Sequence, residues 1–354
     1  MTLTLLFIQA RRRVGLLNAF RKELQRRSIS GRLLTTDTND LDPISYVSDE
    51  AWQLPAGEHP QFSTRLLELC RREKVDCVVP WQDADLLPLA QCRELIEDAG
   101  TKVLLSPIET IKIGNDKKIA SELIKHASSF AGMDQLHVPE IVEFVDLDKA
   151  GVLTGELPNS QSALGFPLMA KPLDGAGSVN CFRCDDQQEL SVAIKKIGLT
   201  KAFVQSFIDG PEFTVDCFAG ANGKLISTCV RERLKTRGGE VLTSKTVADP
   251  FLLAAAEHLS SLVEFFGPFN FQVIKNDKGY WFTEFNPRLS GGATLSIEAG
   301  WNAPGWIIDL LQGNELIPPD QIQTGLHVLR YHEEVCIREE DLLSRKGNAF
   351  NEQF

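Results

Sequence analysis

Residues 280–300 read YWFTEFNPRLSGGATLSIEAG and begin as an apolar strand, Tyr280–Phe285. Alternate side chains of a strand share a face, so we expect Glu284, Asn286 and Arg288 to project in one direction while the aromatic residues pack. Pro287 has no N–H to donate to a neighbouring strand, and the strand is therefore expected to end there. The small residues that follow allow a ligand to approach the backbone closely.

A second strand-like run, FNFQVIK at 269–275, precedes this stretch and is joined to it by the turn Asp277-Lys278-Gly279. A three-residue loop there would set Gln272 opposite Glu284. Mg²⁺ prefers oxygen ligands and takes one or two carboxylates together with substrate phosphates. The hairpin is thus predicted to hold a metal ion through Gln272, Glu284 and Asn286. The competing explanation, and the commoner one, is a half-exposed hairpin with its polar residues in water.

The continuation EFNPRLSGG, after a strand that bears a glutamine, resembles the metal-binding signature of the ATP-grasp superfamily. The similar branch is the one related to the large subunit of carbamoyl-phosphate synthetase, and the likeness runs from Asp116 to about Gln312. It implies an α/β fold, α+β in its C-terminal part. The domains would be a Rossmann-like pre-ATP-grasp domain at 1–112, a linker helix and lid at 113–205, and a C-terminal antiparallel-sheet subdomain at 206–354.

Bulk properties narrow the class of protein. The 354-residue chain has a net charge of −11, which argues against a nucleic-acid binder. Its start, MTLTLLFIQARRR, places the positive charges after the apolar run and is not typical of a signal peptide. No apolar run approaches the roughly 18 residues that cross a bilayer. Of the eight cysteines only Cys181 and Cys184 are spaced C-x-x-C, so we expect structural cysteines in a reducing, cytoplasmic setting.

Strands and helices alternate in the first third of the chain, which predicts an open α/β sheet with its ligand crevice at the carboxyl ends of the strands. The expected strands are Leu3–Ile8, Gly31–Thr35, Asp76–Pro80 and Thr101–Leu105, and the expected helices are Val14–Arg27, Phe62–Lys74 and Ala84–Ala99.

The first loop of this region, QARRRVG, lacks G-x-G-x-x-G, so dinucleotide binding is the weaker hypothesis. Its Arg11–Arg13 triplet either contacts an anion or forms a solvated helix entrance. Asp83 and Asp85 follow the third strand, at the expected crevice, and either contact an amine substrate or cap the next helix.

The remainder is expected to contain further strands and helices around a loop at 151–165. The strands are Phe166–Pro172, Lys201–Ile208, Leu225–Glu240 and Leu326–Val335, and the helices are Ile113–Ala127, Pro250–Phe266 and Ala303–Gln312.

Two lysines stand where an unpaired cation is unfavourable. Lys117 lies in the first turn of a helix, where the macrodipole disfavours it, and Lys171 ends an apolar strand. The resemblance implies that both bind phosphate oxygens. It also implies a lid loop whose backbone N–H groups hold phosphate, an adenine-binding hinge, and a ribose-binding Glu212. The lid residues are Gly175, Ala176, Gly177 and Ser178, and the hinge residues are Gln205, Ser206, Phe207 and Ile208.

The strand-like run at 225–240 contains three arginines at alternate or nearly alternate positions. Arg231, Arg233 and Arg237 either bind the substrate carboxylate and its acyl phosphate or pair with glutamates on a solvated face. Further residues expected at the substrate are Arg288, Ser290, Gly291 and Gly292. Arg288, Lys171 and Asn286 are the expected catalytic residues.

The resemblance implies an ATP-dependent carboxylate–amine ligase that forms an amide or peptide bond through an acyl phosphate and releases ADP and phosphate. It implies ATP and two Mg²⁺ ions, with Mn²⁺ as a substitute, and small amino-acid-like carboxylate and amine substrates. No nucleic-acid or membrane partner is expected, and a homodimer is one option. The alternatives are a carboxylase or small-molecule kinase with the same ATP site, and a non-catalytic nucleotide-binding protein.

Overall fold

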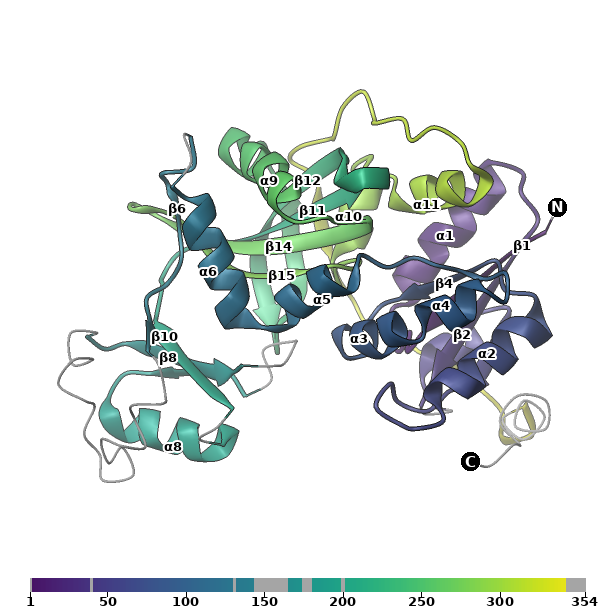
Figure 1. The fold of residues 1–354 in the computed structure, drawn as a ribbon, viewed down its shortest axis with the longest axis horizontal. Helices are drawn as coiled ribbons and strands as arrows, with labels where there is room; N and C mark the ends of the chain where they lie inside the picture. Colours follow the sequence, from purple (N-terminus) through teal and green to yellow (C-terminus); the bar gives the residue numbers. More distant parts are fainter. Residues whose placement is uncertain are drawn as a thin grey trace.

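The computed structural model describes residues 2–38, 41–129, 132–142, 165–173, 180–198 and 201–341. These residues form three β-sheets with helices packed on them (Figure 1). The predicted fold class, α/β with antiparallel sheets in the later part, is confirmed. None of the helices in these ranges combines the length and the apolar character needed to cross a bilayer.

The first sheet is parallel and has the strand order β3-β2-β1-β4-β5. Its strands are β1 (Leu3–Ile8), β2 (Gly31–Asp37), β3 (Glu50–Gln53), β4 (Cys77–Pro80) and β5 (Lys102–Val103). The strand β3, preceded by the 3₁₀ turn η1 (Pro43–Tyr46), was not predicted because its short EAWQ run lacks an apolar pattern. The strand order reverses at β1, which is therefore the topological switch point of this sheet.

Helices cover both faces of the parallel sheet. They are α1 (Val14–Arg26), α2 (Phe62–Glu73), α3 (Asp83–Gln91) and α4 (Arg93–Glu97). The single helix expected at 84–99 is two helices, since the chain leaves helical geometry at Cys92. Apolar side chains of α2 and α3 pack on one face, and α1 packs on the other.

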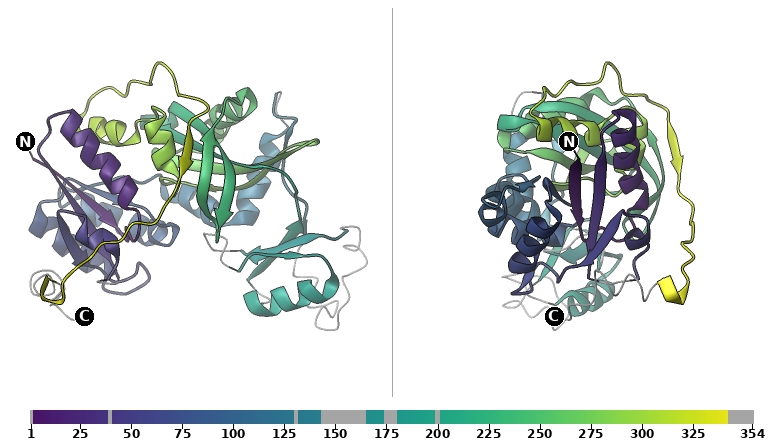
Figure 2. Two further views of the ribbon diagram at one scale, coloured as in Figure 1. Left: turned by 180° about the vertical axis from the view of Figure 1, so that it is seen from behind. Right: turned by 90° about the vertical axis from the view of Figure 1, so that its right-hand side faces the viewer.

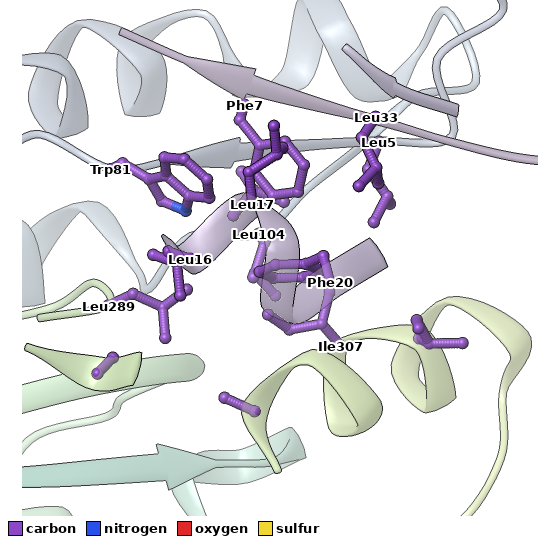
Figure 3. Close-up of a cluster of buried hydrophobic side chains, with 14 of the residues drawn as sticks. Leu5, Phe7, Leu16, Leu17, Phe20, Leu33, Trp81, Leu104, Leu289 and Ile307 are labelled. Atoms are coloured by element: carbon purple, nitrogen blue, oxygen red, sulfur yellow. The ribbon is translucent and has the colours of Figure 1, made fainter. Parts of the chain in front are cut away.

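The C-terminal helices α10 (Ala293–Glu298) and α11 (Ala303–Gln312) join α1 in one hydrophobic core. In this core Phe20 of α1 lies close to Ile307 of α11 and Trp81 packs against Phe7 (Figure 3). A hollow of about 860 Å³ lies beside these helices, and most of the charged residues that line it, Arg27 and Asp309 among them, pair with one another.

A second, four-stranded sheet has the order β7-β10-β8-β9 and carries α8 (Gln187–Ile197) (Figure 1). The side chain of Asp186 caps α8 by accepting from two backbone N–H groups. The strands are β7 (Ile141–Val142), β8 (Leu168–Pro172), β9 (Phe182–Cys184) and β10 (Ala202–Ser206). This sheet lies mostly within the segment predicted to contain the lid, and we keep the lid assignment as a proposal. The loop expected at 151–165, apart from Gly165, and the predicted lid residues 175–178 lie outside the described residues.

The third sheet has seven strands in the order β16-β13-β12-β11-β14-β15-β6. All its pairs are antiparallel except β6 with β15. The strands are β6 (Leu136–His137), β11 (Glu212–Ala219), β12 (Leu225–Arg237), β13 (Glu240–Thr246), β14 (Gly267–Asn276), β15 (Gly279–Asn286) and β16 (His327–Leu329), with the 3₁₀ turn η3 (Ala221–Gly223) before β12. Three helices pack near this sheet: α5 (Ile108–Asn115), α6 (Lys117–Ala127) and α9 (Pro250–Leu262).

Two predictions in this region need correction. The helix expected at 113–127 is split at Asp116, whose carboxylate caps α6 by accepting from the N–H groups of Lys118 and Ile119. The strand expected at 326–335 is only three residues long. After β16 the chain runs extended along the outside of the molecule (Figure 2) and is mostly exposed, so apolar residues such as Tyr331 do not pack in a sheet. We keep the domain limits 1–112, 113–205 and 206–354 as a proposal.

Candidate active site

The hairpin of β14 and β15 places the predicted metal ligands on one face through a bulge. Its turn has two residues, because Asn276 pairs with Gly279, so the expected three-residue loop is wrong. The register then shifts between Val273, opposite Phe282, and Gln272, opposite Glu284. The extra residue is Thr283, and it restores the predicted Gln272–Glu284 pairing while Phe282 and Phe285 both remain buried.

The three predicted ligands meet around one carboxylate oxygen. Gln272 Nε2 donates to Glu284 Oε1 at 2.9 Å, and Asn286 Nδ2 lies 3.5 Å from the same oxygen. The side-chain oxygen of Gln272 accepts from Arg233 Nη1 at 2.7 Å. Within the described ranges no group of three His, Cys, Asp or Glu side chains is arranged to hold a metal. A single carboxylate with amide oxygens fits Mg²⁺, which is usually held by one or two carboxylates and substrate phosphates.

The second sheet carries a buried lysine, Lys171, whose pKa responds to the charge of Glu284 on the hairpin. Lys171 at the end of β8 is only 8% exposed. Burial lowers the pKa of Lys171 to about 8, the negative charge of Glu284 opposes that change, and the positive charge of Lys117 adds to it. Lys117 is the first residue of α6, and its Nζ donates to the carbonyl of Leu173 at 3.3 Å. Two predicted phosphate-binding lysines and a predicted metal ligand therefore interact electrostatically.

The predicted hinge lies between the lid sheet and the seven-stranded sheet. Gln205 and Ser206 end β10, and Glu212 begins β11. The Phe207 N–H donates to the Pro167 carbonyl at 3.2 Å, so that donor is used within the lid. Glu212 lies 3.1 Å from Arg233 Nε, and this arginine links the predicted ribose-binding carboxylate to Gln272.

Arg231 is the most deeply buried of the predicted substrate-binding arginines, at 1% exposure. Its Nε donates to Asp216 Oδ2 at 2.6 Å, and its Nη2 donates to Ser290 Oγ at 2.9 Å. Its Nη1 has no hydrogen-bond partner within the described part of the chain. A Cβ on Gly292 would lie 2.4 Å from Nη1, so glycine at this position allows the guanidinium to reach the 290–292 segment.

Three further arginines surround the same segment. Arg288 forms a bidentate pair with Asp83, Arg330 donates to the Gly291 carbonyl, and Arg13 Nη1 donates to the Leu289 carbonyl at 3.3 Å. Burial lowers the pKa of Arg13 to about 9, and the charges of Arg288 and Arg330 lower it further while Asp83 opposes them. Such a concentration of cations at one place favours an anion.

Sequence reasoning missed Arg330 altogether and left Arg13 open. The RRR triplet at 11–13 pointed to Arg13 as a candidate anion contact. No motif surrounds Arg330, whose position depends on the path of the chain after β16. Arg237 is exposed at the end of β12, next to the turn, and its role at the substrate stays a prediction.

Comparison with known proteins agrees with this arrangement. Residues 199–334 match the family model described as ATP-grasp in the biosynthetic pathway with Ter operon, and residues 5–104 match that of the PylC-like N-terminal domain. No curated protein matched the chain. By these matches, residues 199–334 belong to an ATP-grasp family and residues 5–104 to the PylC-like N-terminal domain family.

Solved structures share this fold at low sequence identity. The biotin carboxylase domain of 2-oxoglutarate carboxylase from Hydrogenobacter thermophilus, solved with MgADP, ADP and bicarbonate, has a TM-score of 0.67 at 16% identity, covering 91% of this chain and 73% of its own. N5-carboxyaminoimidazole synthetase from Staphylococcus aureus with ADP has a TM-score of 0.67 at 17% identity, covering 89% and 79%. L-amino acid ligase from Bacillus licheniformis has a TM-score of 0.64 at 18% identity, covering 89% and 77%.

Proposed function

We propose that this protein is an ADP-forming ligase that joins a small carboxylate to an amine through an acyl phosphate. The observation that carries the proposal is the convergence of the hairpin side with the second sheet: Lys117 Nζ of α6 donates to the carbonyl of Leu173, just after β8, and the charge of Glu284 raises the pKa of the buried Lys171 at the end of that strand. A cation beside a carboxylate on a polar hairpin face suits the phosphates of a metal-bound nucleotide. The ADP-bound and MgADP-bound neighbours with this fold support the same assignment.

In this proposal the nucleotide lies between the lid and the seven-stranded sheet. Lys117 and Lys171 bind phosphate oxygens, and Glu212 binds the ribose. Gln272, Glu284 and Asn286 would hold two Mg²⁺ ions, or Mn²⁺, which neutralise phosphate charge. The side-chain oxygen of Gln272 now accepts from Arg233 and has a second lone pair with which it would bind a metal.

The carboxylate substrate is assigned to the arginines around 290–292. Arg231 Nη1 is buried and without a partner in the described residues, and a carboxylate oxygen would satisfy it. Ser290 Oγ and the backbone of Gly291 and Gly292 lie beside it. Arg288 and Asn286, adjacent to both the metal ligands and this segment, are the groups placed to orient the phosphoryl group during transfer.

The chemistry then takes two balanced steps. A carboxylate oxygen attacks the γ-phosphorus, the bond to the β-phosphate oxygen breaks, and ADP leaves with that electron pair. The neutral amine attacks the acyl carbon, the carbon–oxygen bond to phosphate breaks, and the amine loses a proton to water as the amide forms. The chain's cations stabilise the charge that develops on the phosphoryl oxygens in both steps.

Substitution of Glu284 by Gln tests the assignment. We expect substrate-dependent ADP release to fall about 100-fold or more, because one carboxylate supplies the charge that holds the metal. Glu257→Gln, on the exposed side of α9, is the matched control and should keep wild-type turnover. Unchanged ADP release by Glu284→Gln would refute the metal assignment.

The substrates are sought by measuring ADP release over pairs of small acids and amines, with mass spectrometry of the product. A requirement for bicarbonate in place of an amine would favour the carboxylase alternative. We also propose a reducing, cytoplasmic setting, which eight cysteines without a disulfide bond favour.

A further inference from the structure

The carboxyl edge of the parallel sheet contains an acid that no group in the described residues satisfies. Asp85, the third residue of α3, is 3% exposed, and its Oδ2 has no hydrogen-bond partner among those residues. It does not cap the helix, because α3 has no side-chain cap and an acid that caps a helix bonds to its N–H groups. The helix-capping alternative for Asp85 therefore does not explain its burial.

A second unsatisfied acceptor lies at the same edge. Gln9 directly follows β1, is 2% exposed, and its Oε1 has no partner in the described part of the chain either. Its Nε2 lies 3.4 Å from the carbonyls of Leu54 and Pro55, in the loop after β3. That loop also touches α3, since a Cβ on Gly57 would lie 2.7 Å from Pro88. Gln9 is thus enclosed between the switch-point strand, this loop and α3.

Charged groups of both signs surround Asp85. Burial makes the largest contribution to its raised pKa, the positive charge of Arg11 opposes that change, and Asp37 at the end of β2 and Asp83 two residues earlier add to it. Asp37 accepts from the backbone N–H of Arg11 at 2.9 Å, and Asp83 is already paired with Arg288. The edge therefore offers buried oxygen acceptors whose hydrogen-bonding capacity is not filled by the described residues.

We propose that Asp85 and Gln9 form a binding site for an ammonium group of the amine substrate, at the topological switch point of the N-terminal sheet. An ammonium carries three N–H donors and no acceptor, which matches an orphan carboxylate oxygen and an orphan amide oxygen. The Asp83–Arg288 pair connects this site to the segment at 288–292. The assignment of the ligand as a substrate rests on the proposed function, and the class it implies is a diamine or a basic amino acid.

Binding is measured with three probes, L-lysine, L-ornithine and 1,4-diaminobutane, by calorimetry on the full chain with and without MgADP. L-norleucine, a zwitterion that keeps the α-ammonium and lacks only the side-chain ammonium, is the comparison with no net charge. We expect at least one cationic probe to bind the wild-type protein and L-norleucine to bind at least tenfold more weakly. Asp85→Asn, which keeps the shape and removes the charge, should weaken that probe at least tenfold. Asp98→Asn, an exposed acid after α4, should leave its affinity unchanged.

The MgADP titration separates this proposal from the ligase proposal. The ammonium site is overturned if Asp85→Asn and the wild type bind the probe equally well, or if no cationic probe binds to the wild type. In either case, MgADP binding by the wild type leaves the nucleotide site standing. Absence of MgADP binding by the wild type overturns the ligase proposal and the assignment of the ligand as its substrate, while binding of a cationic probe would leave the ammonium site itself standing. Wild-type MgADP affinity in Asp85→Asn verifies that the variant is folded.

Discussion

Replacing Asp85 by Asn is expected to stabilise the protein at neutral and alkaline pH. Burial is the main reason that the pKa of Asp85 rises to about 7 from an ordinary value of 3.8. Between these values the folded protein holds a proton that the unfolded chain has released, so stability falls as the pH rises through this interval. Above pH 7 the loss reaches its full size, and below about pH 4 it vanishes.

The magnitude follows from the two pKa values. Each pKa unit corresponds to about 1.4 kcal/mol, so ionised Asp85 costs the folded state about 4 kcal/mol at pH 8. Asparagine cannot ionise and avoids this cost at every pH. The stability difference between Asp85→Asn and wild type should therefore grow from near zero at pH 4 to a few kcal/mol at pH 8. Asp37, Asp83 and Arg11 face Asp85 and are present in both proteins.

Native-state hydrogen exchange of the amides in β1 and β4 is the suitable assay, because it reports unfolding of the N-terminal sheet separately from the other sheets. Each pH compares variant with wild type, and Asp98→Asn serves as control. A difference that does not change with pH, or an Asp85→Asn variant less stable than wild type at pH 8, would refute the reasoning.

Three other substitutions test the site and the packing. Gly292→Ala places a Cβ 2.4 Å from Arg231 Nη1 and should raise the KM for the carboxylate substrate about tenfold. The control is Gly291→Ala, which should raise this KM much less because a Cβ on Gly291 meets no atom within 4 Å. Equal KM values for the two variants would contradict the role of Arg231. Lys171→Met should weaken MgADP binding, measured by calorimetry, about 10- to 100-fold. Lys195→Met, at an exposed lysine, is the control. Equal affinity of Lys171→Met and the wild type for MgADP would exclude a contact between Lys171 and phosphate. Arg27→Ala removes a two-bond pair with Asp309 that joins α1 to α11 and should destabilise the protein by about 1–3 kcal/mol in urea unfolding. Arg26→Ala, whose side chain is 64% exposed, should cost less than about 1 kcal/mol, and the reverse order would contradict the role of Arg27 in joining the two helices.

The elements that could be predicted are those whose pattern is local. The runs Leu3–Ile8 and Ala303–Gln312 became β1 and α11 with the expected bounds, and Gly313 ends α11 at a φ of 72°. The hairpin face of Gln272, Glu284 and Asn286 was also predictable, because strand alternation and the resemblance agreed. The loop length was wrong, since a bulge at Thr283 leaves no sign in the apolar pattern.

The sequence by itself predicted a polar hairpin face for a metal ion and raised an anion-binding role for two lysines and several arginines, with solvated surface positions as the alternative. Only the tertiary structure decided which of them meet: Arg288 with Asp83, 205 residues away, Arg330 with Gly291, and Arg231 against Gly292. The burial of Asp85 could not be predicted from the sequence either, because it depends on the packing of the loop after β3 against α3. Periodicity and motifs report on neighbours along the chain, whereas burial and long-range pairing arise from the packing of distant segments.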